Sequence, residues 1–330
     1  MSASPLTHPR TSSHHGGERA LALTDVSKTY PGTPPIRAVD GIDLEVSRGE
    51  LFGLLGPNGA GKSTTVGMCT TRIRPTGGHV EVTGLDAARD PARVKRRIGV
   101  VTQDNTLDRS LTLRENLLYH CQYFGWSSRR ARARADELLE RFRLRDRADA
   151  FPLQISGGMA QRLQVARAIA HEPALLFLDE PTAGLDPQSR IALWELVEEL
   201  RSDGLTVLLT THHMEEADAL CDRVAIIDHG RVLVCDTPER LKAAHGAEAV
   251  VELTLADEPE EALLGRMREL PGVTSVERTP GGLRVMAADG DGLFARAVTA
   301  ADGAGLRDAS VVGSTLEAVF INLTGRDLRE

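Results

Sequence analysis

The sequence lacks the long apolar run that a membrane-spanning helix needs, because none of its apolar stretches approaches about 20 residues. It also lacks an excess of basic residues: 39 lysines and arginines stand against 47 aspartates and glutamates, and the formal net charge is −8. Nothing electrostatic favours nucleic acid or an anionic membrane surface, so we expect no nucleic-acid partner. Residues 1–19 lack the apolar core of a signal peptide and indicate a disordered leader.

Cysteine is also scarce. The four cysteines are Cys69, Cys121, Cys221 and Cys235; they lie far apart, and no C-x-x-C pair is present. This pattern does not have the spacing of a metal site or of a disulfide framework. We therefore expect four small, buried, hydrophobic side chains in a protein of a reducing cytoplasm.

One glycine-rich stretch dominates what the sequence does contain. It follows the apolar run 51–55 and precedes a segment without a helix breaker until Pro75, which is the context that a phosphate-binding P-loop needs. The stretch reads Gly56-Pro57-Asn58-Gly59-Ala60-Gly61-Lys62-Ser63-Thr64. Its glycines allow successive backbone N–H groups to turn towards phosphate oxygens, and the positive end of the next helix points to the same place. The sequence therefore predicts a nucleoside triphosphate site, with Lys62 at the β- and γ-phosphates and the Ser63 hydroxyl on Mg²⁺.

Short strands and helices alternate through the rest of residues 20–246, which indicates an α/β fold. Strands are predicted at 21–26, 42–46, 51–55, 79–82, 98–101, 175–178, 206–209, 224–227 and 232–234, with a turn at 28–32. The β signal vanishes between 111 and 152, where Thr112 and Ser127 are placed to cap helices. Two more helices are predicted, one from 156 and one over 187–202.

The composition shifts after Gly246. Strands are predicted from 250 and over 273–277, 283–286 and 309–312, and helices over 260–270, 293–301 and 316–323. The first six elements have the order β-α-β-β-α-β. Residues 247–330 therefore indicate a small α+β C-terminal domain of ferredoxin-like type.

Two further motifs carry chemistry. Asp179 ends an apolar strand and is the expected second Mg²⁺ contact, while Glu180 follows it and can polarise the water that attacks the γ-phosphate. A second anion site is predicted where Ser156-Gly157-Gly158 opens a helix far from the P-loop in sequence. A symmetric dimer explains this arrangement, because each copy can then cap the nucleotide of the other.

Together these residues resemble the ATPase of an ATP-binding-cassette (ABC) transporter over roughly residues 20–245. Gly56–Ser63 is similar to its Walker A motif, Gln103 to its Q-loop, Ile155–Met159 to its signature, Leu175–Glu180 to its Walker B motif, Gly184-Leu185-Asp186 to its D-loop, His212 to its switch histidine, and Tyr30 to the aromatic residue that stacks on adenine. Met159 departs from the usual glutamine of the signature, which puts one polar contact to the partner's nucleotide in doubt.

The resemblance implies a P-loop NTPase fold with antiparallel β and helical subdomains, the helical one at about 108–170. It also implies ATP and Mg²⁺ as ligands and a homodimer in the ATP-bound state. The implied catalytic residues are Glu180, His212 and Gln103; the ATP-binding residues are Tyr30 and the stretch Gly56 to Thr64; the Mg²⁺ ligands are Ser63, Gln103 and Asp179; and the contacts to the partner's ATP are Ser156, Gly157, Gly158 and Asp186.

Some of these assignments have simpler alternatives. Tyr30 can be a core or turn tyrosine, and Gln103 can be an ordinary polar residue at a strand end. The pair His212-His213 can suggest a metal, although its place after a strand and two threonines favours a γ-phosphate sensor. The aromatic residues Tyr119, Tyr123, Phe124 and Trp126 form either a docking surface for a membrane subunit or the core of the helical subdomain.

Three features narrow the resemblance: the Met-containing signature, the run Thr210–Ala217 and the tail Leu316–Arg326 are similar to the daunorubicin-resistance and nodulation-factor-export type of ATPase. Such a protein is peripheral on the cytoplasmic side of the membrane and works with a separate multispan permease of the ABC-2 type. The implied substrates are drugs, antibiotics, lipids or glycolipids. The alternatives are an importer ATPase and a non-transport ABC-type ATPase; the tail disfavours the first, and a single P-loop without sustained heptads disfavours the second.

Overall fold

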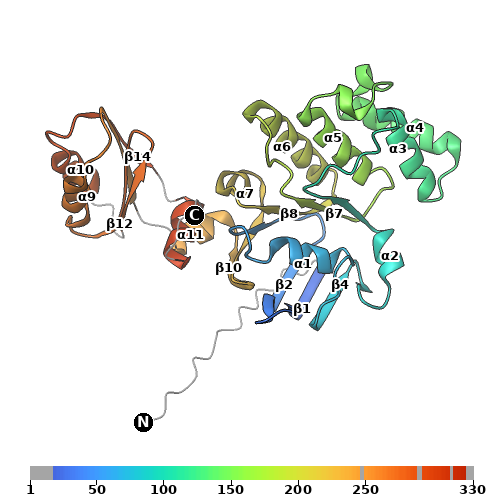
Figure 1. The fold of residues 1–330 in the computed structure, drawn as a ribbon, viewed down its shortest axis with the longest axis horizontal. Helices are drawn as coiled ribbons and strands as arrows, with labels where there is room; N and C mark the ends of the chain where they lie inside the picture. The colour runs from blue at the N-terminus through green and yellow to red at the C-terminus, as the bar shows by residue number, and fades with distance from the viewer. Residues whose placement is uncertain (1–17, 246–248, 288–291, 313–314, 325–330) are drawn as a thin grey trace, which may run out of the picture.

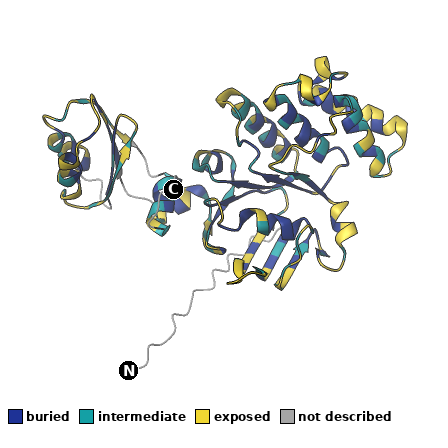
Figure 2. Ribbon diagram, in the orientation of Figure 1, coloured by how far each residue is buried: buried dark blue, intermediate teal, exposed yellow. Residues whose placement is uncertain are grey.

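The computed structural model describes residues 18–245, 249–287, 292–312 and 315–324. The leader predicted for 1–19 therefore falls almost entirely on residues outside the described part, and Arg19 is already the first residue of β1. Figure 1 shows a larger body formed by residues 18–245, called the main body below, and a smaller C-terminal unit formed by the described residues of 249–312. Figure 2 shows the buried residues gathered in the sheets and on the inward faces of the helices.

A six-stranded sheet of order β10-β9-β3-β8-β7-β6 forms the centre of the main body. Its strands are β3 (Leu51–Leu55), β6 (Ile98–Val101), β7 (Leu175–Asp179), β8 (Thr206–Thr211), β9 (Arg223–Asp228) and β10 (Arg231–Asp236). All neighbouring pairs are parallel except the hairpin of β9 and β10. The strands β3, β7 and β8 are buried at every residue, as expected for parallel strands covered on both faces. The carboxyl ends of β3, β8, β7 and β6 therefore meet at one edge.

An antiparallel sheet and helix α1 cover one face of this central sheet. The antiparallel sheet has the order β2-β1-β4-β5 and consists of β1 (Arg19–Tyr30), β2 (Ile36–Ser47), β4 (Gly77–Val82) and β5 (Leu85–Asp86). Helix α1 (Lys62–Cys69) shares one buried cluster with both sheets. The turn predicted at 28–32 is wrong for residues 28–30, which extend β1 after an irregularity that begins near Asp25 (φ +48°).

Helices cover the other face of the central sheet. They are α3 (Leu113–Tyr123), α4 (Ser128–Arg141), α5 (Gly157–Ala168), α6 (Pro187–Ser202) and α7 (Met214–Leu220), with the short α2 (Pro91–Lys95) outside them and single 3₁₀ turns at Arg145–Arg147 and Pro152–Gln154. The caps predicted from the sequence are present: Thr112 Oγ1 accepts the Glu115 N–H at 3.2 Å, and Ser127 Oγ accepts the Arg130 N–H at 3.4 Å. Each such cap contributes about 1 kcal/mol to helix stability.

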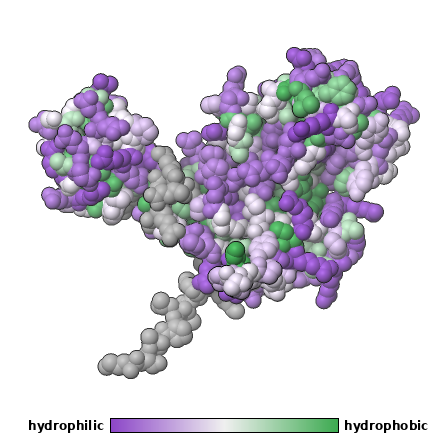
Figure 3. All heavy atoms as spheres, in the orientation of Figure 1, coloured by the Kyte–Doolittle hydropathy of each residue, from purple (hydrophilic) through white to green (hydrophobic). Residues whose placement is uncertain are grey.

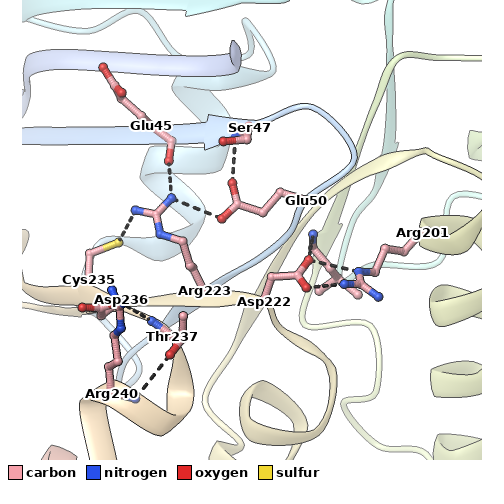
Figure 4. Close-up of polar contacts among 11 residues, drawn as sticks. Glu45, Ser47, Glu50, Arg201, Asp222, Arg223, Cys235, Asp236, Thr237 and Arg240 are labelled. Atoms are coloured by element: carbon pink, nitrogen blue, oxygen red, sulfur yellow. Dashed lines mark hydrogen bonds and ion pairs between the residues drawn. The ribbon is translucent and has the colours of Figure 1, made fainter. Parts of the chain in front are cut away.

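A polar network fixes the amino ends of the central strands, opposite the edge where the carboxyl ends meet (Figure 4). The buried Glu50 accepts the Ser47 N–H at 2.6 Å and lies 3.2 Å from Arg223 Nη1. Asp222 accepts the Leu51 N–H at 2.8 Å and pairs with Arg201 of α6. These contacts hold the start of β3 in register with its neighbours, and β3 is the strand that carries the glycine-rich stretch.

The C-terminal unit has the β-α-β-β-α-β order that the sequence predicted. After α8 (Pro238–His245), its elements are β11 (Ala249–Leu255), α9 (Glu261–Arg268), β12 (Val273–Thr279), β13 (Gly282–Ala287), α10 (Leu293–Ala300) and β14 (Leu306–Val312). The four strands form an antiparallel sheet of order β12-β13-β11-β14. Both helices pack on one face of it through a single buried cluster.

The last described helix, α11 (Leu316–Thr324), joins the two bodies. Leu316, Val319 and Phe320 are buried in the same cluster as the helices of the main body, where α11 packs against α8 and α7. On its other side, Ala318 packs against the C-terminal sheet, and Glu317 pairs with Arg284 of β13. The main body and α11 therefore share one apolar core, although α11 follows the C-terminal unit in sequence.

The cysteines follow the prediction with one exception. Cys69, Cys121 and Cys221 are buried, whereas Cys235 is exposed, so the prediction of four buried cysteines is wrong at this position. The reason is that Cys235 points outwards from β10, whose residues alternate between exposed and half-buried. Arg223 Nη2 donates a hydrogen bond to the Cys235 sulfur at 3.2 Å (Figure 4).

Two histidines, His120 of α3 and His171, link α3 to the start of β6, and their burial predicts a loss of stability in acid. His171 Nε2 lies 3.0 Å from the Ile98 carbonyl oxygen, and His171 Nδ1 lies 3.4 Å from His120 Nε2. The Phe124 ring stacks on the His171 ring, with 3.8 Å between the ring centroids. Burial lowers the pKa of both imidazoles, that of His120 to about 4, with the neighbouring His171 and Arg167 acting in the same direction.

As the pH falls below the unfolded pKa of about 6.5, the unfolded chain takes up protons before the folded chain does, so stability is lost as the pH falls. We expect the lowered pKa of His120 to reduce the free energy of unfolding by on the order of 1–2 kcal/mol at pH 5. Melting temperatures at pH 7.5 and pH 5 test this. Replacing His120 by phenylalanine should reduce the acid-induced drop, and an unchanged drop would contradict the prediction.

Candidate active site

The residues predicted to act on a nucleotide come together at the carboxyl edge of the central sheet. Gly56 follows β3, Asp179 ends β7, and His212 follows β8. Because β3, β8 and β7 are adjacent and parallel, these three positions are neighbours in space. Gln103 lies two residues beyond the end of β6, which pairs with β7.

The glycine-rich turn between β3 and α1 has the geometry of a phosphate cradle. A Cβ atom on Gly56 would lie 2.2 Å from the Ile227 carbonyl oxygen, and one on Gly61 would lie 2.5 Å from the Ala38 carbonyl oxygen. Gly61 also has φ +107°, which favours glycine. Gly61 is the N-cap of α1, so the first N–H groups of the helix have no partner within it and are directed at the turn. The predicted strand, turn and helix are therefore all present.

Lys62 is held at the mouth of this turn. Its ammonium donates to the carbonyl oxygens of Gly56 at 2.8 Å and Pro57 at 3.1 Å, and it lies 3.3 Å from Glu180 Oε1. The side chain is only 5% exposed, and burial lowers its pKa, against the opposing effect of the Glu180 and Asp179 charges. A buried cation with carbonyl and carboxylate partners at a turn rich in free N–H groups fits a polyphosphate ligand.

Two predicted Mg²⁺ ligands are in contact. The Ser63 hydroxyl donates to Asp179 Oδ1 at 3.3 Å, and the Thr210 hydroxyl donates to the same oxygen at 2.6 Å. A hydroxyl and a carboxylate oxygen are the ligand types that Mg²⁺ prefers, so these residues fit the ion. The Gln103 side chain is exposed, and its place near Asp179 follows only from the pairing of β6 with β7.

Glu180 lies between a cation and a histidine. Its Oε1 faces Lys62, and its Oε2 lies 3.3 Å from His212 Nδ1. Its backbone has φ +49°, a conformation that costs of order 1 kcal/mol for a non-glycine residue. The Glu180 N–H donates to both the carbonyl oxygen and the hydroxyl of Thr210, each at 3.1 Å, and these bonds hold the unusual conformation.

Thr210 is a residue of the candidate site that the sequence reasoning missed. One hydroxyl fixes both Asp179 and the Glu180 backbone, although Thr210 comes from the next strand. The available signal was that the apolar run of β8 ends in two threonines at a buried strand end. Buried threonines at such a place need hydrogen-bond partners, which here are supplied by the acidic pair of β7.

The second predicted anion site lies at the start of α5. Ser156 Oγ caps the helix by accepting the Met159 N–H at 3.2 Å. A Cβ on Gly157 would meet no atom within 4 Å, whereas one on Gly158 would lie 2.4 Å from Ser189 Oγ of α6. Met159, the unusual residue of the signature, packs against the apolar core of the helices. It therefore has a structural role.

Asp186 occupies the corresponding position at the start of α6. Its carboxylate accepts the Ser189 N–H at 2.9 Å and the Ser189 hydroxyl at 2.6 Å, and these bonds lower its pKa. Because Ser189 also lies against Gly158, the predicted D-loop and signature are neighbours. Both Ser156 and Asp186 are exposed.

Tyr30 ends β1 and pairs with Ile36, two residues before Ala38, the residue whose carbonyl approaches Gly61. The half-buried ring is therefore on the strand pair beside the glycine-rich turn, with Lys28 Nζ 5.1 Å from its centroid. This place is compatible with the predicted adenine contact.

Comparison with known proteins agrees with this geometry. The family model described as ABC transporter matches residues 39–183. The chain is 43% identical over 310 residues to the daunorubicin/doxorubicin resistance ATP-binding protein DrrA of Streptomyces peucetius, covering 93% of each chain. It is 39% identical over 317 residues to the Nod factor export ATP-binding protein I of Paraburkholderia xenovorans, covering 95% of this chain and 99% of that one.

Among solved structures, a dimeric ATP-binding cassette bound to ADP and Pi in a post-hydrolysis state superimposes with a TM-score of 0.61 at 30% identity. The match covers 66% of this chain and 98% of that one. The resemblance inferred from the sequence motifs is thus confirmed, and the P-loop NTPase fold with it. This chain belongs to the family of ABC transporter ATP-binding proteins.

Proposed function

We propose that this chain is the ATP-hydrolysing subunit of an ABC exporter that acts through a separate membrane permease. The observation that carries the proposal is the Glu180 carboxylate held between Lys62 and His212 at the carboxyl edge of the sheet. A carboxylate in this place can accept a proton from a water molecule, while the ammonium meets phosphate charge. The most direct test is ATP turnover by variants at Lys62 and Glu180, which should each lose most of the wild-type rate.

In the proposed mechanism, the N–H groups of the glycine-rich turn and α1 bind the β- and γ-phosphates. Lys62 shifts from the Gly56 and Pro57 carbonyls towards the charge that develops on the γ-phosphate. Ser63 and Asp179, with Gln103, would hold Mg²⁺, which neutralises phosphate charge when bound.

Glu180 orients the attacking water and accepts its proton in the proposed mechanism. His212 lies against the second carboxylate oxygen and keeps the Glu180 side chain directed at the γ-phosphate. The Thr210 hydroxyl and carbonyl hold the Glu180 backbone, so the base is positioned before the substrate binds.

The start of α5 supports a site shared between two copies of the chain. Gly157 is open to solvent at a helix N-terminus, and among the described residues no atom lies close enough to explain the missing side chain. We infer that this end of α5, with Asp186 beside it, faces the γ-phosphate bound by the other copy. The homodimer in the ATP-bound state follows from that arrangement.

The share of the chain that is similar to the named relatives favours export over import. The relatives named for daunorubicin resistance, Nod factor export and linearmycin resistance match 93–95% of this chain. The similarity therefore includes the C-terminal unit, whereas the matched solved cassettes cover 66–68%. We propose residues 20–246 as the ATPase domain and 247–330 as an accessory domain of an exporter for drugs, antibiotics, lipids or glycolipids.

The aromatic residues near the Q-loop have two different environments. Tyr119 and Tyr123 are 48% and 85% exposed, whereas Phe124 stacks on His171 and Trp126 packs against the helical core under Arg130. The two tyrosines are therefore our candidate docking surface for an ABC-2 type permease. Figure 3 shows that apolar patches interrupt the mostly hydrophilic surface of the main body.

No helix in the described ranges has both the length and the apolarity needed to cross a membrane. We therefore predict that attachment to the cytoplasmic face of the membrane requires the permease. Co-expressed with its permease, the chain should sediment with membranes, and without it the chain should remain in the supernatant after a high-salt wash. Sedimentation of the chain alone would contradict this.

A substitution tests the docking surface directly. Replacing Tyr123 by serine should reduce copurification with the permease, because it removes the most exposed aromatic ring of the surface. The control is Ile191 replaced by serine, since Ile191 is 54% exposed on α6, away from the docking surface. Equal copurification of the two variants would remove Tyr123 from the proposed surface.

A further inference from the structure

We propose that Glu216 is a positioning residue. It keeps the switch histidine, His212, and the turn after Glu180 in their correct relative positions during hydrolysis. Glu216 lies in the first turn of α7, four residues after His212, and its side chain is fully buried. The inference rests on the role proposed above for His212. It adds a residue that touches neither nucleotide nor metal and acts through the groups that do.

The carboxyl group of Glu216 is hydrogen-bonded to one helix and lies close to two further segments. Its Oε1 accepts a hydrogen bond from Trp194 Nε1 of α6 at 3.0 Å. Burial raises the pKa of Glu216, and the nearby hydroxyls of Thr211 at the end of β8 and of Thr182 act in the opposite direction. Its Oε2 is buried with no hydrogen-bond partner among the described residues. The group is therefore held in an apolar place where the protonated, hydrogen-bonding form is favoured.

Each of these three segments carries a residue of the proposed site. Thr182 is two residues beyond Glu180, and α6, which carries Trp194, begins at the cap Asp186. Thr211 immediately precedes His212, and its hydroxyl also accepts the His213 N–H at 2.9 Å. Glu216 thus lies where the switch, the turn after Glu180 and the D-loop helix meet.

Removing the carboxyl should affect the rate and spare the binding. The glycine-rich turn and Lys62 hold the triphosphate from β3 and α1, whereas the hydrogen bond of Glu216 goes to Trp194 of α6. Without the carboxyl, the Trp194 N–H loses its acceptor and His212 loses part of its support. A misplacement of about 1 Å at a reacting group can cost about 100-fold in rate.

The test compares single-turnover ATP hydrolysis and ATP affinity for Glu216→Ala and Glu216→Gln. The alanine variant should hydrolyse roughly 10- to 100-fold more slowly, with an ATP Kd within about twofold of wild type. The glutamine variant should recover most of the rate, because an amide can accept from Trp194 and donate to a threonine hydroxyl. Trp194→Phe keeps an aromatic ring but removes the N–H donor, so its rate should lie between the rates of the two Glu216 variants.

A matched control separates positioning from stability. Glu50 is also a buried glutamate, but its partners lie at the opposite end of β3. Glu50→Ala should lower the melting temperature and leave the rate per folded molecule unchanged. If Glu216→Ala and Glu50→Ala lose the same rate at equal folded fraction, or if Glu216→Ala loses affinity instead of rate, Glu216 is only structural and the proposal fails.

A double-mutant cycle with His212→Ala shows whether Glu216 acts through the histidine. If it does, Glu216→Ala should cost much less in the His212→Ala background than in the wild type. Full additivity of the two losses would overturn the inference while leaving the role of His212 intact. A His212→Ala variant with the wild-type rate would instead refute the proposed function itself, so the two failures are distinguishable.

Discussion

Replacing Lys62 by alanine is expected to abolish ATP hydrolysis and to weaken nucleotide binding. Lys62 supplies a buried ammonium at the glycine-rich turn, where it can meet charge on the β- and γ-phosphates. The loss of one such preorganised contact costs about 3–4 kcal/mol at the transition state, which is a 10²- to 10³-fold fall in rate. The measurement is phosphate release by the purified variant, together with ATP binding at equilibrium.

The fold should survive this substitution. Burial lowers the pKa of Lys62, which means that keeping the ammonium charged at this place costs stability. The variant should therefore melt no lower than about the wild-type temperature. Lys95→Ala, at an exposed lysine of α2, is the matched control and should hydrolyse ATP normally. Turnover by Lys62→Ala near the wild-type rate would contradict the P-loop assignment.

Replacing Glu180 by glutamine should separate binding from hydrolysis. The amide keeps the shape of the side chain and its place between Lys62 and His212, but it cannot accept a proton. We expect hydrolysis to fall by roughly 10²- to 10⁴-fold, as for the loss of a general base. ATP affinity should persist, because the glycine-rich turn, Ser63 and Asp179 hold the triphosphate without Glu180.

Glu215, three residues after His212, provides the control for this experiment. It lies in the first turn of α7 and is exposed, so Glu215→Gln changes the local charge by the same amount without touching the site. This variant should keep the wild-type rate. Normal hydrolysis by Glu180→Gln would refute the base assignment, and an equal loss in both variants would indicate a general charge effect.

Much of the site could be predicted because its residues follow strands that end at one sheet edge. An apolar run that stops at Asp179-Glu180, or at Thr211 before His212, indicates both the strand and the position of the polar residue after it. Glycines that cannot carry a Cβ mark the turn at Gly56 and Gly61 in the same way. These signals are local, so a single sequence contains them.

The remainder depends on contacts between distant segments. Nothing local distinguishes Glu216 from the exposed Glu215 beside it. The packing of α7 against β3 and β8, with the bond to Trp194 of α6, buries one and leaves the other in solvent. The same holds for the adjacent aromatics Phe124, which is half-buried against His171, and Tyr123, which is exposed. The place of α11 on the main body depends on how the chain returns from the C-terminal unit, which periodicity does not encode.

We propose that two copies of the chain enclose the nucleotide between the glycine-rich turn of one and the start of α5 of the other. The most direct test is the molar mass of Glu180→Gln by size-exclusion chromatography with light scattering, with and without MgATP. We predict twice the mass of the chain with MgATP and the monomer mass without it. Adding Ser156→Arg should restore the monomer, because it places bulk and charge at the shared contact. An inactive Glu180→Gln protein that binds ATP yet stays monomeric, even with its permease, would contradict the claim.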